Sequence, residues 1–240
     1  MAIVHRGGAA LAPENSLAAF ALASELGFRY LETDIRVTSD GHLVCFHDRG
    51  LERVTSATGL VRSKSIHDLR KLRINGIEPI PTFDEALDAF PEQCFTVDLK
   101  DRAGIAPLMK SLRRKGVAER VCIAGAWDGW LAHVRREVPL VTTALGWRSL
   151  TALLSCARAG LRPPKSLATG PFAHVPVKLG NVPIFVERLV AMSHDIGVRV
   201  VTWTVDEPVV IRRLLDARVD AIITDRPDVL REVLIQRGDW

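Results

Sequence analysis

Residues 30–48 read Tyr30-Leu-Glu-Thr-Asp-Ile-Arg-Val-Thr-Ser-Asp-Gly-His-Leu-Val-Cys-Phe-His-Asp48, which predicts a strand, a tight turn and a returning strand. Glu32 and Asp34 are two residues apart, so their side chains leave the same face of an extended strand. The turn is too short for a crossover, so the run Leu43–His47 must return antiparallel to its predecessor. The hairpin can bring two carboxylates and His47 into one pocket, an arrangement suited to metal-assisted hydrolysis.

A plainer interpretation is a surface strand whose charged face meets solvent. Alternation of charged and apolar residues is common in such strands. Glu32 and Asp34 become functional only if His5, His47 and a third acid converge on the same face.

The rest of the chain alternates short β-branched runs with helical patterns, which is typical of βα units. We predict eight parallel strands, with Leu43–His47 left out of the count as an excursion above the rim. The predicted strands are Ala2–His5, Tyr30–Arg36, Phe95–Lys100, Val121–Ala124, Leu140–Ala144, Ser166–Thr169, Val198–Thr204 and Asp220–Thr224. A chain of 240 residues fits one (β/α)8 TIM barrel, a fold of about 250 residues. We therefore expect an α/β protein with one barrel domain over residues 1–240 and a β-hairpin excursion after strand 2.

Helical patterns lie between these strands, several behind recognisable N-terminal signals such as Thr82 followed by Glu85. The predicted helices are Glu14–Leu26, Phe83–Phe90, Ile105–Lys115, Asp128–Glu137, Ser149–Ala159, Ile184–Ile196, Pro208–Asp216 and Pro227–Gln236. The segment Leu51–Pro81 has no clear strand and is predicted to be a loop insertion with a short helix at Ile66–Leu72.

Composition excludes several classes of protein. With 48% hydrophobic and 25% charged residues the chain is an ordinary globular protein. We expect no membrane anchor and no signal peptide, because no apolar run approaches the roughly 20 residues of a bilayer span. The net charge of +4 comes from arginines scattered along helices without interleaved aromatics, so no nucleic-acid partner is expected. Four widely spaced cysteines predict reduced thiols and a cytoplasmic location; they are Cys45, Cys94, Cys122 and Cys156.

Polar residues concentrate where strands of such a barrel end, the side on which barrel enzymes carry their active sites. Asp98 and Lys100 end the third predicted strand, as His5 ends the first. Together with Glu32 and Asp34, Asp98 gives three carboxylates without a cysteine. That set favours one hard divalent cation, Mg²⁺ or Ca²⁺ with Mn²⁺ also compatible, over zinc.

The basic residues near these acids indicate an anionic small-molecule substrate. Arg6 and Lys100 suit a phosphate group whose charge redistributes during displacement. His5 and His47 can divide the proton transfers, one accepting a proton from the nucleophile and the other donating one to the leaving oxygen. The remaining histidines, including His174, have no comparable context and are interpreted as surface or local helix residues.

An ordered series of motifs extends over nearly the whole chain. It comprises His5-Arg-Gly-Gly8, Pro13-Glu-Asn-Ser-Leu-Ala-Ala-Phe20, the Leu31–Asp48 hairpin, Val97-Asp-Leu-Lys100, Trp203-Thr-Val-Asp206 and Val219-Asp-Ala-Ile-Ile-Thr-Asp-Arg-Pro227. This series resembles the glycerophosphodiester phosphodiesterase family, which has a TIM barrel of the phosphatidylinositol-phosphodiesterase type. The resemblance implies metal-dependent hydrolysis of glycerophosphodiesters to glycerol 3-phosphate and an alcohol, a reaction of lipid and glycerol metabolism.

The resemblance also implies roles for individual residues. His5 and His47 match the general acid and base, and Trp203 matches an aromatic wall of the pocket. The metal ligands would be Glu32, Asp34 and Asp98, and the phosphate contacts Arg6 and Lys100. In many members of the family a neighbouring hydroxyl of the substrate is thought to attack phosphorus first, giving a cyclic phosphate that water then opens.

Two departures from the family pattern bear on the position of the metal and on the alcohol preference, respectively. Asp98 stands where the family more often has Glu, and the insertion after the hairpin is short. Two alternatives stay open: a lysophospholipase D-like enzyme acting on a lipid phosphodiester, since the related phospholipase D-like sphingomyelinases share this arrangement, and a non-catalytic barrel that binds a phosphate ligand. Glu14 and Asn15, ahead of the first helix, are expected to cap it. Direct contact with the metal is the alternative role for these two residues.

Overall fold

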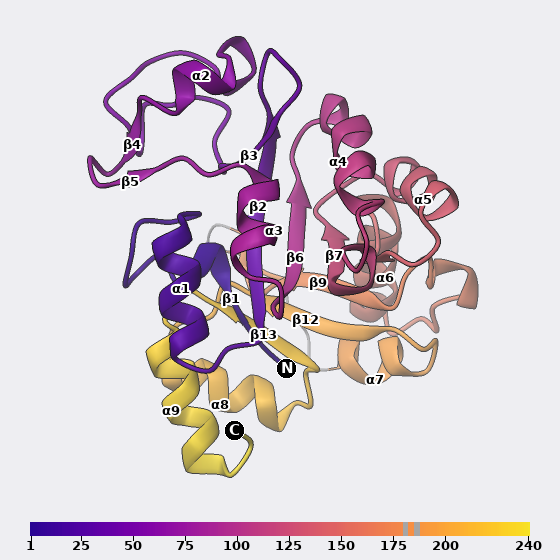
Figure 1. Cartoon of the computed structure of the whole chain (residues 1–240). Helices are drawn as coiled ribbons and strands as arrows, with labels where there is room; N and C mark the ends of the chain where they lie inside the picture. Colours follow the sequence, from indigo (N-terminus) through magenta and orange to yellow (C-terminus); the bar gives the residue numbers. More distant parts are fainter. Residues whose placement is uncertain (180–181, 185–187) are drawn as a thin grey trace.

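The computed structural model describes residues 1–179, 182–184 and 188–240. Eight parallel strands of this part form a barrel, ordered β8-β7-β6-β2-β1-β13-β12-β9, so that neighbours in space follow one another along the chain (Figure 1). They are β1 (Ala2–Val4), β2 (Tyr30–Val37), β6 (Cys94–Leu99), β7 (Val121–Ala124), β8 (Thr142–Thr143), β9 (Phe172–Pro176), β12 (Arg199–Trp203) and β13 (Ala221–Thr224). A parallel bridge between Ala144 and Phe172 joins the two outer strands and nearly closes the barrel. The predicted (β/α)8 fold is confirmed.

Helices follow the strands and cover the outside of the barrel (Figure 1). They are α1 (Leu17–Glu25), α3 (Phe83–Ala89), α4 (Ile105–Leu112), α5 (Asp128–Glu137), α6 (Trp147–Ala159), α7 (Arg188–His194), α8 (Pro208–Asp216) and α9 (Pro227–Arg237). The predicted capping box starts α3: the Thr82 hydroxyl accepts from the Glu85 amide at 3.1 Å, and the Glu85 carboxylate accepts from the Thr82 amide at 2.8 Å. Proline at the first position of α8 and α9 supplies the fixed φ that helix starts favour.

In the excursion after β2 the predicted β-hairpin forms, but the segment Leu51–Pro81, predicted to have no strand, contains two short paired strands, because Asn75 and Gly76 adopt the positive φ of a tight turn. β3 (Leu43–Cys45) pairs antiparallel with the end of β2, and the chain then runs through α2 (Ile66–Leu69), β4 (Arg73–Ile74) and β5 (Glu78–Pro79). Its apolar residues form a cluster apart from the main core: Val44, Phe46, Leu51, Val54, Val61, Leu69, Ile74 and Ile80. In Figure 1 this excursion stands above one side of the barrel mouth. Its own buried cluster lets it hold a defined shape there.

The strand β6, which carries Asp98, is held in place by aromatic packing on its outer face. Phe95 packs edge to face on Phe20 of α1 and on Phe83 of α3, with ring centroids 5.7 and 6.3 Å apart. By the alternation of a strand, Asp98 then faces the barrel interior. Burial of these aromatic rings therefore fixes the direction of the inner side chains.

Three further sequence predictions need correction. The sixth strand is β9, and the predicted run Ser166–Thr169 overlaps a 3-10 turn (Lys165–Leu167). The run Phe172–Pro176 pairs along its whole length with β12, and this tertiary pairing outweighs the local propensity of residues 166–169. The first helix begins at Leu17, where the Ser16 hydroxyl caps it by accepting from the Ala19 amide.

The third correction concerns the predicted helix Ile184–Ile196. This segment is helical over α7, and its residues 185–187 lie outside the described part of the chain.

Among the described residues no helix combines the length and apolarity needed to cross a bilayer. The four cysteines are free thiols.

Candidate active site

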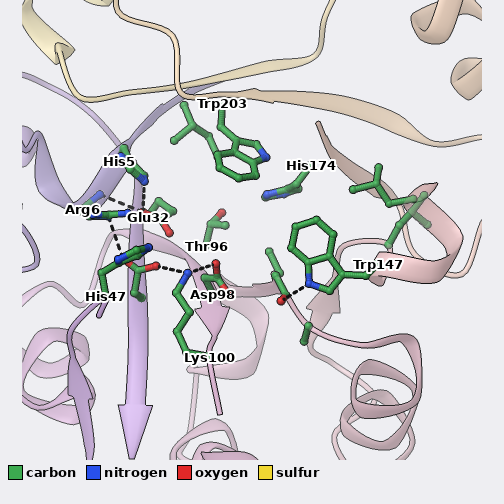
Figure 2. A pocket seen from close by; sticks show the side chains of 17 residues that line it. His5, Arg6, Glu32, His47, Thr96, Asp98, Lys100, Trp147, His174 and Trp203 are labelled. Carbon is green, nitrogen blue, oxygen red and sulfur yellow. Dashed lines mark hydrogen bonds and ion pairs between the residues drawn. The ribbon is translucent and has the colours of Figure 1, made fainter. Parts of the chain in front are cut away.

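The eight residues singled out in the sequence line one cavity of about 170 Å³ at the barrel mouth. They are His5, Arg6, Glu32, Asp34, His47, Asp98, Lys100 and Trp203. All of them except Asp34 are labelled in Figure 2. His5, Arg6, Asp98, Lys100 and Trp203 lie at or just beyond the carboxyl ends of parallel strands, and His47 follows the returning hairpin strand. Glu32 and Asp34 lie inside β2, but the register sets them level with the ends of the neighbouring strands, because Leu31 pairs with Val4 and Asp34 pairs with Asp98. The barrel geometry brings these ends to one rim.

The turn after β1 places the first histidine and arginine. Arg6, Gly7 and Gly8 have φ of 50°, 80° and 95°, a left-handed run that glycine tolerates best. A Cβ on Gly7 would lie 2.6 Å from the Ala19 Cβ, so the helix behind the turn also requires glycine there. This turn directs the Arg6 amide to donate to Glu32 Oε2 at 3.0 Å.

His5 is held by a carboxylate on each side. Its Nδ1 lies 2.8 Å from Asp225 Oδ1, and its Nε2 lies 3.8 Å from Glu32 Oε2. Burial alone would lower the pKa of His5, but Glu32 and Asp225 outweigh burial and raise it above the ordinary value. With Nδ1 donating to Asp225, Nε2 faces the pocket.

His47 has a similar anchor at the other side of the cavity. Its Nδ1 lies 2.7 Å from Asp48 Oδ1, and its side chain is 33% exposed, against 13% for His5. Burial, with Arg6 adding to it, lowers the pKa of His47 below the ordinary value despite the nearby carboxylates. The pKa values of the two imidazoles are therefore shifted in opposite directions, which is the pattern of an acid and base pair.

The three predicted acids are buried in the floor between these histidines. Asp34 and Asp98 are direct partners in the β2–β6 register, and Glu32 lies one inward position earlier on β2. Burial and the neighbouring Asp34 raise the pKa of Glu32. Burial also favours neutral Asp34, but Lys100 and Arg6 outweigh it and lower the pKa of that carboxyl.

Two cations neutralise this floor. Lys100 Nζ lies 2.8 Å from Asp34 Oδ1 and 2.5 Å from Asp98 Oδ2, and Arg6 Nε lies 3.0 Å from Asp34 Oδ2. Asp98 Oδ1 is buried and has no hydrogen-bond partner among the described residues. A Cβ on Gly125 would lie 1.9 Å from that oxygen, so only glycine at position 125 leaves room for the Asp98 carboxylate.

A metal site is not preformed in this arrangement. No group of three or more His, Cys, Asp and Glu side chains in the described ranges is placed to hold a metal ion as it stands. The donor set is nevertheless of the right kind, because carboxylate oxygens are the ligands of Mg²⁺ and Ca²⁺ and the buried Asp98 Oδ1 is not already engaged in a hydrogen bond to a described residue. The ammonium of Lys100 now occupies the space between Asp34 and Asp98.

A chain of charges links Arg6 to Asp48, the carboxylate that anchors His47. Arg53 donates from Nη1 and Nη2 to the two oxygens of Glu14, at 2.7 Å each, and from Nε to Asp48. Glu14 in turn accepts from Arg6 Nη1 at 3.1 Å. The prediction that Glu14 caps the first helix is wrong, because the helix starts three residues later, at Leu17. The Glu14 carboxylate instead accepts hydrogen bonds from Arg6 and Arg53.

Asn15 also has a different role from the expected cap. It adopts φ of 57°, and its side-chain amide donates to Asp34 Oδ2 at 3.2 Å while accepting from Thr33 Oγ1 at 2.7 Å. The side chain thus orients a pocket carboxylate. Glu14 and Asn15 precede Ser16, the residue that caps the helix. Their position ahead of the cap was the signal in the sequence that they have another role.

The wall opposite the charged floor is aromatic (Figure 2). It is formed by Trp147 at the start of α6, Trp203 at the end of β12 and His174 on β9. Trp147 Nε1 donates to the Gly125 carbonyl at 2.8 Å, which holds the indole in place. His174 is an inward strand residue and not a surface or helix residue, and burial lowers its pKa to about 4. The sequence analysis missed His174 because it placed the sixth strand at residues 166–169. Strand alternation marks position 174 as inward-facing only when the strand is placed at residues 172–176.

Two other site residues were not predicted. Asp225, which anchors His5, follows β13 and satisfies the same strand-end rule that identified the others. Arg53 lies in the excursion, where no local pattern distinguishes it from a solvated arginine.

Comparison with known proteins places these observations in a family. The model of the "Glycerophosphoryl diester phosphodiesterase family" matches residues 5–229. A Mycobacterium tuberculosis protein named "Probable glycerophosphodiester phosphodiesterase 2" is 37% identical over 100% of this chain and 92% of its own length. "Glycerophosphodiester phosphodiesterase" of Caldanaerobacter subterraneus is 31% identical over 99% of this chain and 98% of its own length.

Solved structures share the fold. An Oleispira antarctica phosphodiesterase, solved in complex with the product sn-glycerol-3-phosphate, superposes with a TM-score of 0.80 at 21% identity, covering 98% of this chain and 96% of that one. The family match, the two relatives and this fold agree over nearly the whole length. This chain belongs to the glycerophosphoryl diester phosphodiesterase family.

Proposed function

We propose that this protein hydrolyses glycerophosphodiesters to glycerol 3-phosphate and an alcohol, with His5 and His47 as its proton-transfer groups. One observation carries the proposal: each imidazole is anchored through Nδ1 by a carboxylate, Asp225 or Asp48, which leaves Nε2 of each ring for proton transfer in one pocket. The names of the two close relatives support the substrate class.

The proposed reaction has two steps. In the first, His47 accepts the proton of a neighbouring substrate hydroxyl as its oxygen attacks phosphorus, and His5 donates a proton to the departing alcohol oxygen. In the second, water opens the cyclic phosphate with the two roles reversed. The greater exposure of His47 and the opposite pKa directions of the imidazoles support this assignment. Because the attack is intramolecular, the protein needs chiefly to position the diester.

We further propose that Arg6 and Lys100 contact the phosphate and that Trp203 packs against the organic part of the substrate. One divalent cation, Mg²⁺ or Ca²⁺ with Mn²⁺ also compatible, would be held by Glu32, Asp34 and Asp98. When bound, it would neutralise charge on the phosphoryl oxygens. The unpartnered buried oxygen of Asp98 supports this ligand set. A cytoplasmic location is also proposed, supported by the four free thiols.

The proposal is tested by measuring release of glycerol 3-phosphate from glycerophosphocholine and glycerophosphoethanolamine. Activity should disappear with EDTA, return with Mg²⁺ or Ca²⁺, and be lost in Glu32→Ala. His67→Gln, which changes an exposed histidine of the excursion, serves as the matched control. Full activity in EDTA would contradict the metal, and metal-dependent turnover of lysophospholipids alone would favour a lipid phosphodiesterase.

A further inference from the structure

A second basic cavity lies outside the catalytic pocket. It measures about 290 Å³ and is lined by Arg36, Arg49, Leu60, Arg62 and Asp101, none of which lines the first cavity. We call it the rim arginine pocket. Its walls come from the end of β2, the residue after Lys100 and the excursion. Three guanidinium groups face a single carboxylate in this space.

The backbone holds the two exposed arginines of this pocket near each other. Gly50 and Leu60 form an antiparallel bridge, and the Val61 amide donates to the Arg49 carbonyl at 2.9 Å. Arg49 and Arg62 therefore lie on adjoining segments of a loop that has its own apolar cluster. Their proximity follows from this pairing and does not depend on a chance side-chain arrangement.

The buried member of the set is already fixed. Arg36 is 7% exposed; its Nε donates to the His47 carbonyl at 2.8 Å and its Nη1 to both Asp101 oxygens at 3.1 Å. Asp101 thus neutralises Arg36. These hydrogen bonds use Nε and Nη1 of the Arg36 guanidinium.

Charge in the rim arginine pocket is unbalanced. Within the described part of the chain, Arg49 and Arg62 make no ion pair, whereas Arg70 of the same excursion pairs with Glu85 at 2.7 Å. After Asp101 is matched with Arg36, two positive charges remain beside one cavity. Like charges held together in this way favour an anionic ligand, and planar guanidinium groups bind oxyanions through paired N–H donors.

We propose that the rim arginine pocket binds a dianionic phosphate group, that is, orthophosphate or a phosphomonoester. The two unpaired guanidinium groups match the charge of a phosphomonoester, about −1.5 to −2 at neutral pH. The cavity is also much larger than the roughly 30 Å³ of one water molecule. Two sources share this chemistry: a soluble phosphate compound and the headgroup of phosphatidic acid. The proposal is independent of the proposed reaction, since none of its residues lines the catalytic pocket.

The test is calorimetric titration of the full chain with orthophosphate, accompanied by backbone amide NMR. Arg49→Gln/Arg62→Gln should bind at least tenfold more weakly at one site, and shifts at Gly50 and Leu60 should be lost while those at Gly125 in the catalytic pocket persist. Arg29→Gln/Arg162→Gln removes two exposed charges elsewhere and should bind as the unaltered protein does. Dimethyl phosphate, a monoanion, should bind this site severalfold more weakly than orthophosphate.

Vesicles of phosphatidylcholine with and without phosphatidic acid separate the two sources. Sedimentation with phosphatidic acid vesicles that is lost in Arg49→Gln/Arg62→Gln would assign the site to a lipid headgroup, whereas orthophosphate binding alone would assign it to a soluble compound. Arg49→Lys/Arg62→Lys keeps the charge and the fold but loses the paired donors, so it should bind at an intermediate level. Shifts confined to the catalytic pocket, with unchanged affinity in Arg49→Gln/Arg62→Gln, would overturn the proposal.

Discussion

Arg53→Gln should impair catalysis although Arg53 touches neither histidine. Its guanidinium joins Glu14 to Asp48, and Asp48 orients His47. The side chain is 47% exposed, and exposed ion pairs contribute at most about 1 kcal/mol each. Loss of both pairs therefore removes up to about 2 kcal/mol of the energy that aligns His47, which corresponds to a fall in kcat/KM of up to about 30-fold at 1.36 kcal/mol per tenfold.

The pH profile distinguishes this positioning role from simple destabilisation. Without Arg53, Asp48 loses its cation and attracts a proton on His47 more strongly, so the pKa of His47 rises. The acid limb of kcat/KM should then move to higher pH. Arg53→Lys should restore the activity only in part, because one ammonium cannot pair with Glu14 at both oxygens and with Asp48 as well.

The matched control is Arg70→Gln, which removes an exposed, paired arginine from the same excursion. Steady-state kinetics across the pH range and urea unfolding of both variants provide the comparison. If Arg53→Gln had the same kcat/KM and the same acid limb as Arg70→Gln, the reasoning about His47 alignment would be refuted.

Three further changes probe the floor, the core and the aromatic wall. Gly125→Ala should displace the Asp98 carboxylate, because the added Cβ would lie 1.9 Å from Oδ1, and calorimetry should show weaker Mg²⁺ binding; unchanged affinity would exclude Asp98 as a ligand. Phe95→Ala should lower the free energy of unfolding in urea by about 3–5 kcal/mol, since this fully buried ring packs on two others; a loss below about 1 kcal/mol would contradict that packing. His174 has a pKa lowered to about 4 by burial, so its contribution of about 3 kcal/mol is present above the unfolded pKa of about 6.5 and is lost as pH falls toward 4. His174→Asn should flatten the fall in unfolding free energy over that window, and an unchanged slope would refute the assignment.

The fold was predictable because its signals are local and periodic. In β2, alternation places Leu31 and Ile35 in the core and Glu32 and Asp34 in the pocket, as expected from the sequence. The sixth strand was not predictable by the same rule. Its short run competes with residues 166–169, and only pairing with β12 decides between them.

The convergence of the site residues was predictable for a related reason. Parallel strands of a barrel end at one rim, so His5, Asp98 and Lys100, which lie at such ends, had to meet. Contacts made by the excursion were not accessible in this way. Arg53 and Glu14 are 39 residues apart, and their pairing depends on how the excursion packs against the first turn. Such long-range ion pairs leave no periodic pattern in the sequence.

The central claim is that two anchored histidines in one pocket transfer the protons of glycerophosphodiester hydrolysis. The most direct measurement is the rate of glycerol 3-phosphate release from glycerophosphocholine by His5→Ala and His47→Ala, compared with His67→Gln. The account predicts a loss of about 10²–10⁴-fold in each of the first two, with substrate binding retained and His67→Gln unaffected. Rates within a fewfold of the unaltered protein in either His5→Ala or His47→Ala would contradict it.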